Sequence, residues 1–182
     1  MDERPVAPQI TLVTPSLPER AHLLAELLDC VAKQTVRPQA HIILVDDDKY
    51  VPKMRKLVSM VKTEYYVEVD DDDLIYPDHV ETLSNNLRGD LVWTWCDVSG
   101  APWSYNSPYR PGVLQQLNYI PSNCAVRVKA LEAVGGWLDV ERPDHPDWNI
   151  LRRFENRRFV FHNVPKVTWQ YRFGVSRQLS QT

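Results

Sequence analysis

The sequence predicts a single compact α/β domain, in which a mostly parallel sheet is flanked by helices. Apolar, β-branched runs alternate with segments whose apolar residues recur at helical spacing. Two of the strand-like runs, HIILVDDD and YYVEVDDDD, end in acidic residues. Because ligands of such sheets bind beyond the carboxyl ends of the strands, we expect both acidic runs at a ligand-binding edge.

The first half of the chain shows repeated strand and helix patterns. Residues 10–14 are a β-rich run, and the spacing of Ser16 and Glu19 is that of a capping box, which predicts that a helix begins there. The apolar residues of this helix recur at helical spacing: Ala21, Leu24, Ala25, Leu28, Val31 and Ala32. The pattern then predicts a strand over 41–48, a helix over 54–61 and a strand over 65–73.

The second half is less regular. A helix after Pro77 and a strand over 91–96 precede a loop over 99–112 that is rich in Pro, Gly, Ser and aromatic residues, and we expect this loop to face substrate. Two helices are predicted over 129–136 and 147–154. Strands are predicted over 123–128, 158–164 and 166–172.

Composition limits the class of protein. A chain of 182 residues with 43% hydrophobic content predicts one domain with one sizeable core, and a net charge of -3 argues against a nucleic-acid partner. Cys30, Cys96 and Cys124 have no C-x-x-C spacing, so they suggest neither a disulfide framework nor a zinc site. No segment approaches the roughly 20 apolar residues of a membrane span, and we expect a cytoplasmic protein.

The four consecutive aspartates over 70–73 need a compensating positive charge, because neighbouring carboxylates repel one another. If the strand alternation continues, Asp70 and Asp72 point to one face while Asp71 and Asp73 diverge. Carboxylate pairs of this kind suit Mg²⁺ or Mn²⁺, which complete their coordination with water and substrate phosphates. A solvated acidic turn without a ligand is the alternative.

A calcium loop starting at Asp70 is a further interpretation. Asp72, Asp78 and Glu81 fit its spacing, but Leu74 and Ile75 stand where an oxygen ligand and a turn-forming glycine are needed. Neither G-x-x-x-x-G-K nor G-x-G-x-x-G occurs, which argues against a P-loop or a dinucleotide site. A phosphate-bearing ligand would therefore be held mainly through a metal.

Four stretches resemble the GT-A glycosyltransferases, and within them the inverting family 2 enzymes: TLVTPSLPER, ILVDDD, YYVEVDDDDLIYPDHVETL and GGWLDVERPDHPDWNILRRF. The resemblance covers about residues 10–172 and implies a Rossmann-like GT-A fold. It implies a nucleotide-sugar half over about 8–97 and an acceptor and catalytic half over about 98–175, within one domain spanning 1–182.

The same resemblance implies roles for particular residues. Asp70 and Asp72 match the metal-binding D-x-D pair, and Asp147 matches the catalytic base, with Asp144 as an alternative base. The alternative to a catalytic role is structural: Asp147 begins a predicted helix, and an acid at a helix N-terminus is stabilised by the helix dipole. The residues expected to contact the nucleotide sugar are Thr14, Pro15, Ser16, Arg20, Asp46, Arg55, Asp70 and Asp71, and Lys53 is an alternative to Arg55.

The implied function is a metal-dependent hexosyl transfer from a nucleoside-diphosphate sugar, with a UDP-sugar favoured, to the hydroxyl of a glycan, protein or small molecule, using Mn²⁺ or Mg²⁺. Two departures from the family stand against it: Pro146 replaces the glutamate before the catalytic aspartate, and Phe173 replaces a metal-binding histidine. A catalytically inactive nucleotide-sugar binding module is therefore the alternative. A nucleotidyltransferase is a more distant one, because TPSLPER is not a basic, glycine-rich phosphate loop.

Overall fold

The computed structural model describes residues 10–102, 104–139 and 145–175. Its strands are β1 (Ile10–Ser16), β2 (Ala40–Val45), β3 (Tyr65–Glu68), β4 (Leu74–Ile75), β5 (Leu91–Ser99), β6 (Cys124–Arg127) and β7 (Phe161–Arg172). Its helices are α1 (Ala21–Ala32), α2 (Tyr50–Ser59), α3 (His79–Ser84), α4 (Val128–Ala133) and α5 (Pro146–Asn156), with 3-10 turns η1 (Pro18–Arg20) and η2 (Val113–Gln115). No helix of these described ranges is long and apolar enough to cross a membrane.

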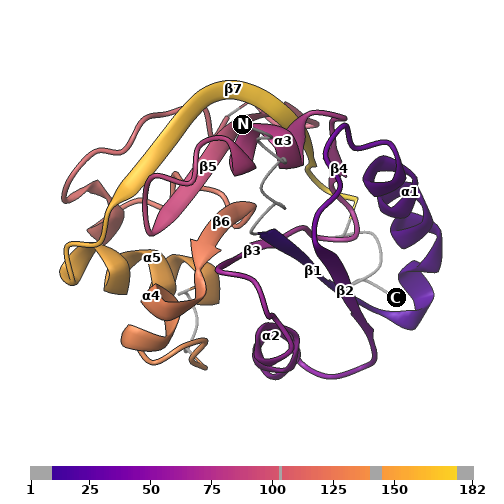
Figure 1. Cartoon of the computed structure of the whole chain (residues 1–182), viewed down its shortest axis with the longest axis horizontal. Coiled ribbons are helices and arrows are strands. Elements are labelled where there is room, and N and C mark those ends of the chain that lie inside the picture. The colour runs from indigo at the N-terminus through magenta and orange to yellow at the C-terminus, as the bar shows by residue number, and fades with distance from the viewer. Residues whose placement is uncertain (1–9, 103, 140–144, 176–182) are drawn as a thin grey trace, which may run out of the picture.

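The strands form one sheet in the order β2-β1-β3-β6-β5-β7-β4. Strands β1, β2, β3, β5 and β7 run in one direction, and β4 and β6 run against them. The predicted α/β class with a mostly parallel sheet is therefore confirmed. The sheet is curled, and β7 arches over one side of the molecule (Figure 1).

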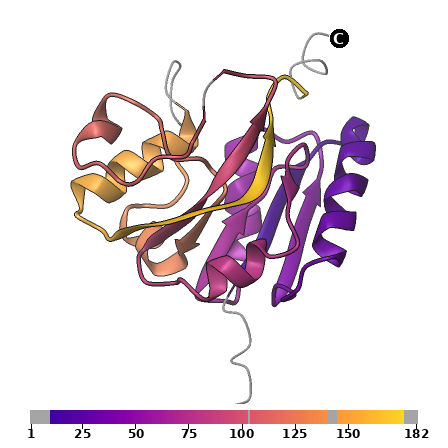
Figure 2. The ribbon, with the colours of Figure 1, turned by 90° about the horizontal axis from the view of Figure 1, so that it is seen from above.

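Two apolar cores lie on opposite faces of the sheet. One face packs against α2, α4 and α5, which contribute Met54, Leu131 and Phe154 among others. The other packs against α1 and α3 through Leu27 and Leu83. The two views in Figures 1 and 2 show these two groups of helices on different sides of the sheet. Packing of helices on both faces holds the sheet in place, and with it the strand ends from which the polar residues of the site project.

The predicted capping box at Ser16 is wrong. Strand β1 continues through Ser16, and the chain then forms η1 before α1 begins at Ala21 without a side-chain cap. The Ser16 hydroxyl donates instead to Asp71 Oδ2 over 2.6 Å. A buried carboxylate is a stronger acceptor for this hydroxyl than a local backbone contact, so a tertiary interaction overrides the local pattern.

The two late strands predicted over 158–164 and 166–172 form one strand, β7. It pairs in parallel with β5, and the register shifts where Thr94 opposes Val164 and Trp95 opposes Val167. Pro165 and Lys166 are thus left exposed as a bulge. A bulge accommodates a proline that cannot donate to the ladder, so the proline does not end the strand.

One buried histidine, His79, and one half-buried histidine, His41, give the fold a pH dependence. Burial lowers the pKa of His79 and of His41 to about 4. His79 Nδ1 lies 2.8 Å from Thr168 Oγ1. His41 Nε2 lies 2.8 Å from Thr14 Oγ1, which itself donates to the Val69 carbonyl, so Nε2 must carry the proton.

We expect the free energy of unfolding to fall as the pH falls from about 6.5 to about 4, because the unfolded chain binds protons that the folded histidines refuse. For the fully buried His79 this amounts to about 3 kcal/mol once the pH is below 4. Urea titrations at several pH values measure it. The slope over this range should be reduced in His79→Gln and retained in the exposed-site control His22→Gln; an unchanged slope in His79→Gln would contradict the assignment.

Candidate active site

Two pockets adjoin at the carboxyl ends of the central strands. The first pocket, of about 270 Å³, is lined by Pro15, Ser16, Leu17, Arg20, Asp48, Tyr50, Lys53 and Asp70. The second pocket, of about 350 Å³, is lined by Tyr50, Asp70, Tyr105, Asn118, Pro121, Ser122, His145, Pro146, Asp147, Trp169 and Tyr171. Asp70 and Tyr50 line both, so a ligand that extends from one pocket into the other must pass these two side chains.

Arg20 provides a cation for the aspartate run. Its Nη2 lies 2.7 Å from Asp71 Oδ1 and 2.8 Å from Asp72 Oδ2. The expected alternation of Asp70 and Asp72 on one face is therefore not what orders the run, because β3 ends at Glu68 and the chain turns at Asp71 and Asp72. Asp71 is fully buried behind the first pocket, where its carboxylate pairs with Arg20 and accepts a hydrogen bond from Ser16.

Asp70 is the carboxylate without a compensating partner. Among the described residues it forms neither a side-chain hydrogen bond nor an ion pair, although it lines both pockets. Burial raises its pKa to about 7, and the charges of Asp72 and Asp71 act in the same direction against the opposing effect of Arg20. Burial and the charge of Asp70 likewise raise the pKa of Asp73 well above its usual range.

These residues fit a hard divalent cation. The donors are carboxylate oxygens, and the one guanidinium of Arg20 is shared by Asp71 and Asp72, while Asp70 has no ion-pair partner within the described residues. Among the residues that the structure describes, no group of three or more His, Cys, Asp or Glu side chains is placed to hold a metal by itself. A cation at Asp70 and Asp72 would therefore take its other ligands from water and from the bound substrate.

Asp147 lies in the first turn of α5 and faces the second pocket. Asn118 Nδ2 donates to its Oδ2 over 3.4 Å. The helix N-terminus also stabilises this carboxylate, which is the structural explanation considered from the sequence. Asp147 is nevertheless oriented toward open space shared with Asp70, as a base acting on a bound hydroxyl must be. The alternative base, Asp144, lies outside the described residues.

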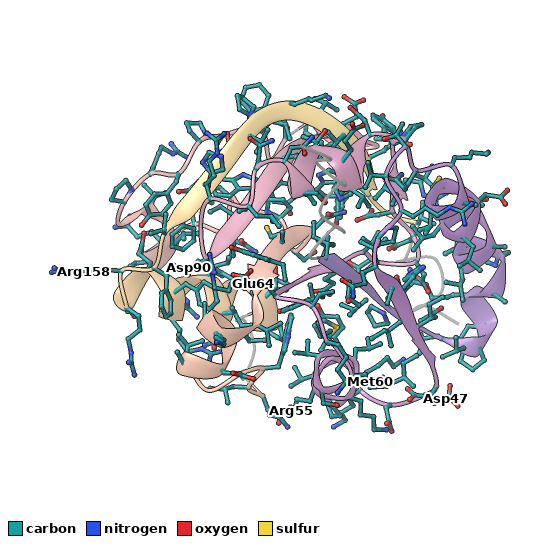
Figure 3. All side chains as sticks on the ribbon, viewed as in Figure 1. Asp47, Arg55, Met60, Glu64, Asp90 and Arg158 are labelled. Atoms are coloured by element: carbon teal, nitrogen blue, oxygen red, sulfur yellow. The ribbon has the colours of Figure 1, made fainter. Side chains whose placement is uncertain are left out.

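Lys53, rather than Arg55, belongs to the first pocket. Its Nζ donates to the Ser16 carbonyl over 2.6 Å and to the Asp46 carbonyl over 2.7 Å, and it pairs with Asp46 Oδ1 at 3.2 Å. Arg55 lies on another side of α2, where it bonds the Trp137 carbonyl and Asp139, and Figure 3 shows it at the rim of the molecule. Arg55, which was predicted to contact the nucleotide sugar, therefore lines neither pocket.

We expect Lys53→Met to lower the free energy of unfolding by about 2 to 4 kcal/mol, because two buried carbonyls lose their donor. Lys56→Met, a change to an exposed lysine on the same helix that also pairs with Asp46, should cost less than about 1 kcal/mol. Denaturant titration of both variants measures this. Equal losses of stability in the two variants would contradict the assignment of Lys53 as the donor that joins the Ser16 carbonyl, at the end of β1, to the Asp46 carbonyl, just after β2.

Tyr50 and Glu68 are site residues that the sequence did not single out. The Tyr50 hydroxyl donates to the carboxylate of the buried Glu68, and its ring stands edge-on to Trp137 at 5.5 Å between centroids. Burial, followed by the charge of Asp70, raises the pKa of Glu68 well above its usual range. An acid within a buried strand was the available signal for Glu68. Tyr50 had none, since an aromatic in a first helical turn is ordinarily core.

The other predicted residues take several places. Pro15 and Ser16 line the first pocket, as does Arg20. Thr14 lies behind the first pocket, where it is fully buried and donates a hydrogen bond to the Val69 carbonyl. Asp46 does not line the first pocket but pairs with Lys53, which does. From the aromatic loop Tyr105 reaches the second pocket. Tyr109 does not line it but stacks on Phe161 at 4.4 Å.

Solved structures with the same fold are found at low sequence identity. Residues 1–349 of S. aureus TarS in complex with UDP-GlcNAc match with a TM-score of 0.72 and 14% identity over 95% of this chain. The chain has a GT-A glycosyltransferase fold. A second match is the mannosyltransferase PcManGT from Pyrobaculum calidifontis in complex with GDP-Man and Mn²⁺, with a TM-score of 0.63 and 15% identity over 92% of this chain.

The GT-A chain described here is shorter than these structures, and it spans 61% of the TarS fragment and 57% of PcManGT. Its sequence matches no protein-family model, and a search of curated proteins gives no match. The likeness therefore establishes the GT-A fold, and the residues of the two pockets must carry the argument for function.

Proposed function

We propose that this GT-A chain is a glycosyltransferase that moves a sugar from a nucleoside-diphosphate sugar to an acceptor hydroxyl. The observation that carries the proposal is the pair of adjoining pockets that share Asp70, one containing Arg20 and the other containing Asp147. The first pocket is lined only by residues between 15 and 70, and the second mostly by residues between 105 and 171. This division suits a donor half and an acceptor half.

In the proposed reaction the nucleotide occupies the first pocket and the sugar extends past Tyr50 and Asp70. Asp147 takes the proton of the acceptor hydroxyl while that oxygen bonds to the anomeric carbon and the bond from this carbon to the diphosphate breaks. Attack from the side of the second pocket, away from the diphosphate, inverts the anomeric configuration. When bound at Asp70 and Asp72, Mn²⁺ or Mg²⁺ neutralises the diphosphate and stabilises it as the leaving group.

Two structural neighbours support the choice of donor. The TarS structure is a complex with UDP-GlcNAc, and PcManGT binds GDP-Man with Mn²⁺. A UDP-sugar is the favoured donor of this chain, and a GDP-sugar is the second candidate. The bound metal of PcManGT agrees with the excess of buried carboxylates around Asp70.

The second candidate function is nucleotide-sugar binding without catalysis. Pro146 and Phe173 favour it, because they replace two residues that the family 2 resemblance leads one to expect. The test is to incubate the protein and Mn²⁺ with UDP-sugars and GDP-sugars and to measure nucleotide release, with mixed sugar and peptide acceptors. Release that requires an acceptor supports transfer. Donor binding with no release under any acceptor supports the binding module, and neither binding nor release contradicts both.

A further inference from the structure

Strand β2 forms an edge of the sheet and pairs only with β1 in the described part of the chain. The Ile10 carbonyl accepts from the Gln39 N–H over 2.9 Å, and the Val13 carbonyl accepts from the Val69 N–H after β3, so the even-numbered residues of β1 face β2. In the parallel register that pairs Leu12 with His41, the backbone groups of Ala40, Ile42 and Leu44 therefore bond β1, and those of His41, Ile43 and Val45 point away from it. The strand contains no proline, lysine or bulge of the kind that protects sheet edges. It can therefore accept another strand.

The charges at the two ends of β2 are complementary to each other. Arg37 lies before the strand and Asp47 after it, and both side chains are exposed and form no ion pair within the described residues. Figure 3 shows Asp47 at the outer end of the strand. If a second copy pairs antiparallel about Ile42, Ala40 faces Leu44 of the second copy and Arg37 faces Asp47 of the second copy. The two-fold axis repeats this ion pair.

An apolar side chain and a groove also match in this register. Val45 is 45% exposed and, by strand alternation, lies on the sheet face that bears His41 and α1. A groove of about 250 Å³ on that face is lined by Val31, Ala32, Arg37, Pro38 and His41. Pairing about Ile42 sets Val45 of the second copy opposite Gln39, between Arg37 and His41. The exposed valine therefore enters the groove.

Helix α1 extends the same apolar surface. Leu28 is 41% exposed, and Ala25 and Ala32 are exposed at the spacing that places them on one helix face. The sequence pattern of this helix contains these residues, but the core takes Leu23 and Leu27 instead. Since Ala32 lines the groove beside β2, this stripe faces the copy that a paired β2 would bring.

We propose that the protein forms a two-fold symmetric dimer in which β2 pairs antiparallel with β2 of a second copy. Backbone hydrogen bonds between His41 of one copy and Ile43 of the other join the two sheets into one. Val45 fills the groove of the other copy, and Arg37 pairs with Asp47 across the interface. Such an isologous contact is closed, so it ends at two copies and does not propagate into a fibre.

Sedimentation equilibrium of four proteins tests the dimer: the natural chain, Arg37→Asp, Asp47→Arg and the double variant. Each single reversal replaces two attractive pairs by two repulsive ones, so the dimer dissociation constant should rise about tenfold or more. The double variant restores opposite charges and should return close to the natural value. Arg158→Asp is the control, because Arg158 is exposed at the opposite end of the molecule (Figure 3).

Amide hydrogen exchange locates the contact. Exchange at His41 and Ile43 should slow when the protein is concentrated from monomer to dimer. A protein that stays monomeric at its highest soluble concentration overturns the proposal. So does a dimer that neither single reversal weakens, or one whose β2 amides exchange as in the monomer, because a different surface would then hold it together.

Discussion

Replacing Asp147 by asparagine is expected to reduce kcat for sugar transfer by about 10²- to 10⁴-fold, the usual contribution of a general base. Asparagine has the size of aspartate and keeps the contact with Asn118, but it cannot accept the proton of the acceptor hydroxyl. Asp147 does not line the first pocket, so affinity for the nucleotide should be unchanged. The combination of lost turnover and retained donor binding distinguishes a missing base from a misfolded protein.

Steady-state kinetics and nucleotide titration of Asp147→Asn measure both quantities. Asp139→Asn is the matched control, because Asp139 is an exposed aspartate that pairs with Arg55 away from the two pockets. It should leave both kcat and nucleotide affinity unchanged. An Asp147→Asn protein that transfers sugar at the natural rate would remove Asp147 from the mechanism.

Replacing Asp72 by asparagine is expected to weaken Mn²⁺-dependent nucleotide binding by about 100-fold or more, since loss of a metal ligand exceeds the 10- to 100-fold cost of losing a supporting residue. The change also frees Arg20 from one of its two carboxylate partners. Nucleotide binding in the presence of a chelator should change much less, because its remaining contacts are those of the first pocket. This contrast assigns the loss to the metal.

Titration of Asp72→Asn with nucleotide, with and without Mn²⁺, gives the comparison. Asp78→Asn is the control from the same acidic segment, since Asp78 pairs with Lys166 and not with Arg20. Unchanged affinity of Asp72→Asn for nucleotide in the presence of Mn²⁺ would exclude Asp72 as a ligand.

The sequence predicts two buried strands that lead into acidic runs, but the strands end at Val45 and Glu68, before the acids that were predicted to continue them. In the structure Pro15, Ser16, Arg20 and Asp70, which the sequence singled out, line one pocket, and Asp147 lines the next one. The sequence does not decide between Arg55 and Lys53 as the pocket residue. Which of two residues on one helix faces the site depends on how that helix is rotated against the sheet. Packing of α2 against β1 turns Lys53 inward.

Contacts distant in the chain account for the other differences. Ser16 has the local pattern of a helix cap, yet Asp71 lies 55 positions further on and takes its hydroxyl. The turn at Asp71 and Asp72 ends the alternation that predicted a converging Asp70 and Asp72, and Arg20 fixes the turn by pairing with both. Glu68 and Tyr50 meet only because α2 returns over β3. Hydrophobic periodicity in the sequence does not predict such contacts between residues that are far apart in the chain.

The most direct test of the proposed donor site is calorimetric titration of the GT-A chain with UDP and, separately, with GDP, each with Mn²⁺ and with chelator. The account predicts that one of the two nucleotides binds in the presence of Mn²⁺ and binds much more weakly in chelator. Absence of binding by either nucleotide under both conditions would contradict it, and the aspartates around Arg20 would then serve another purpose on a shared fold.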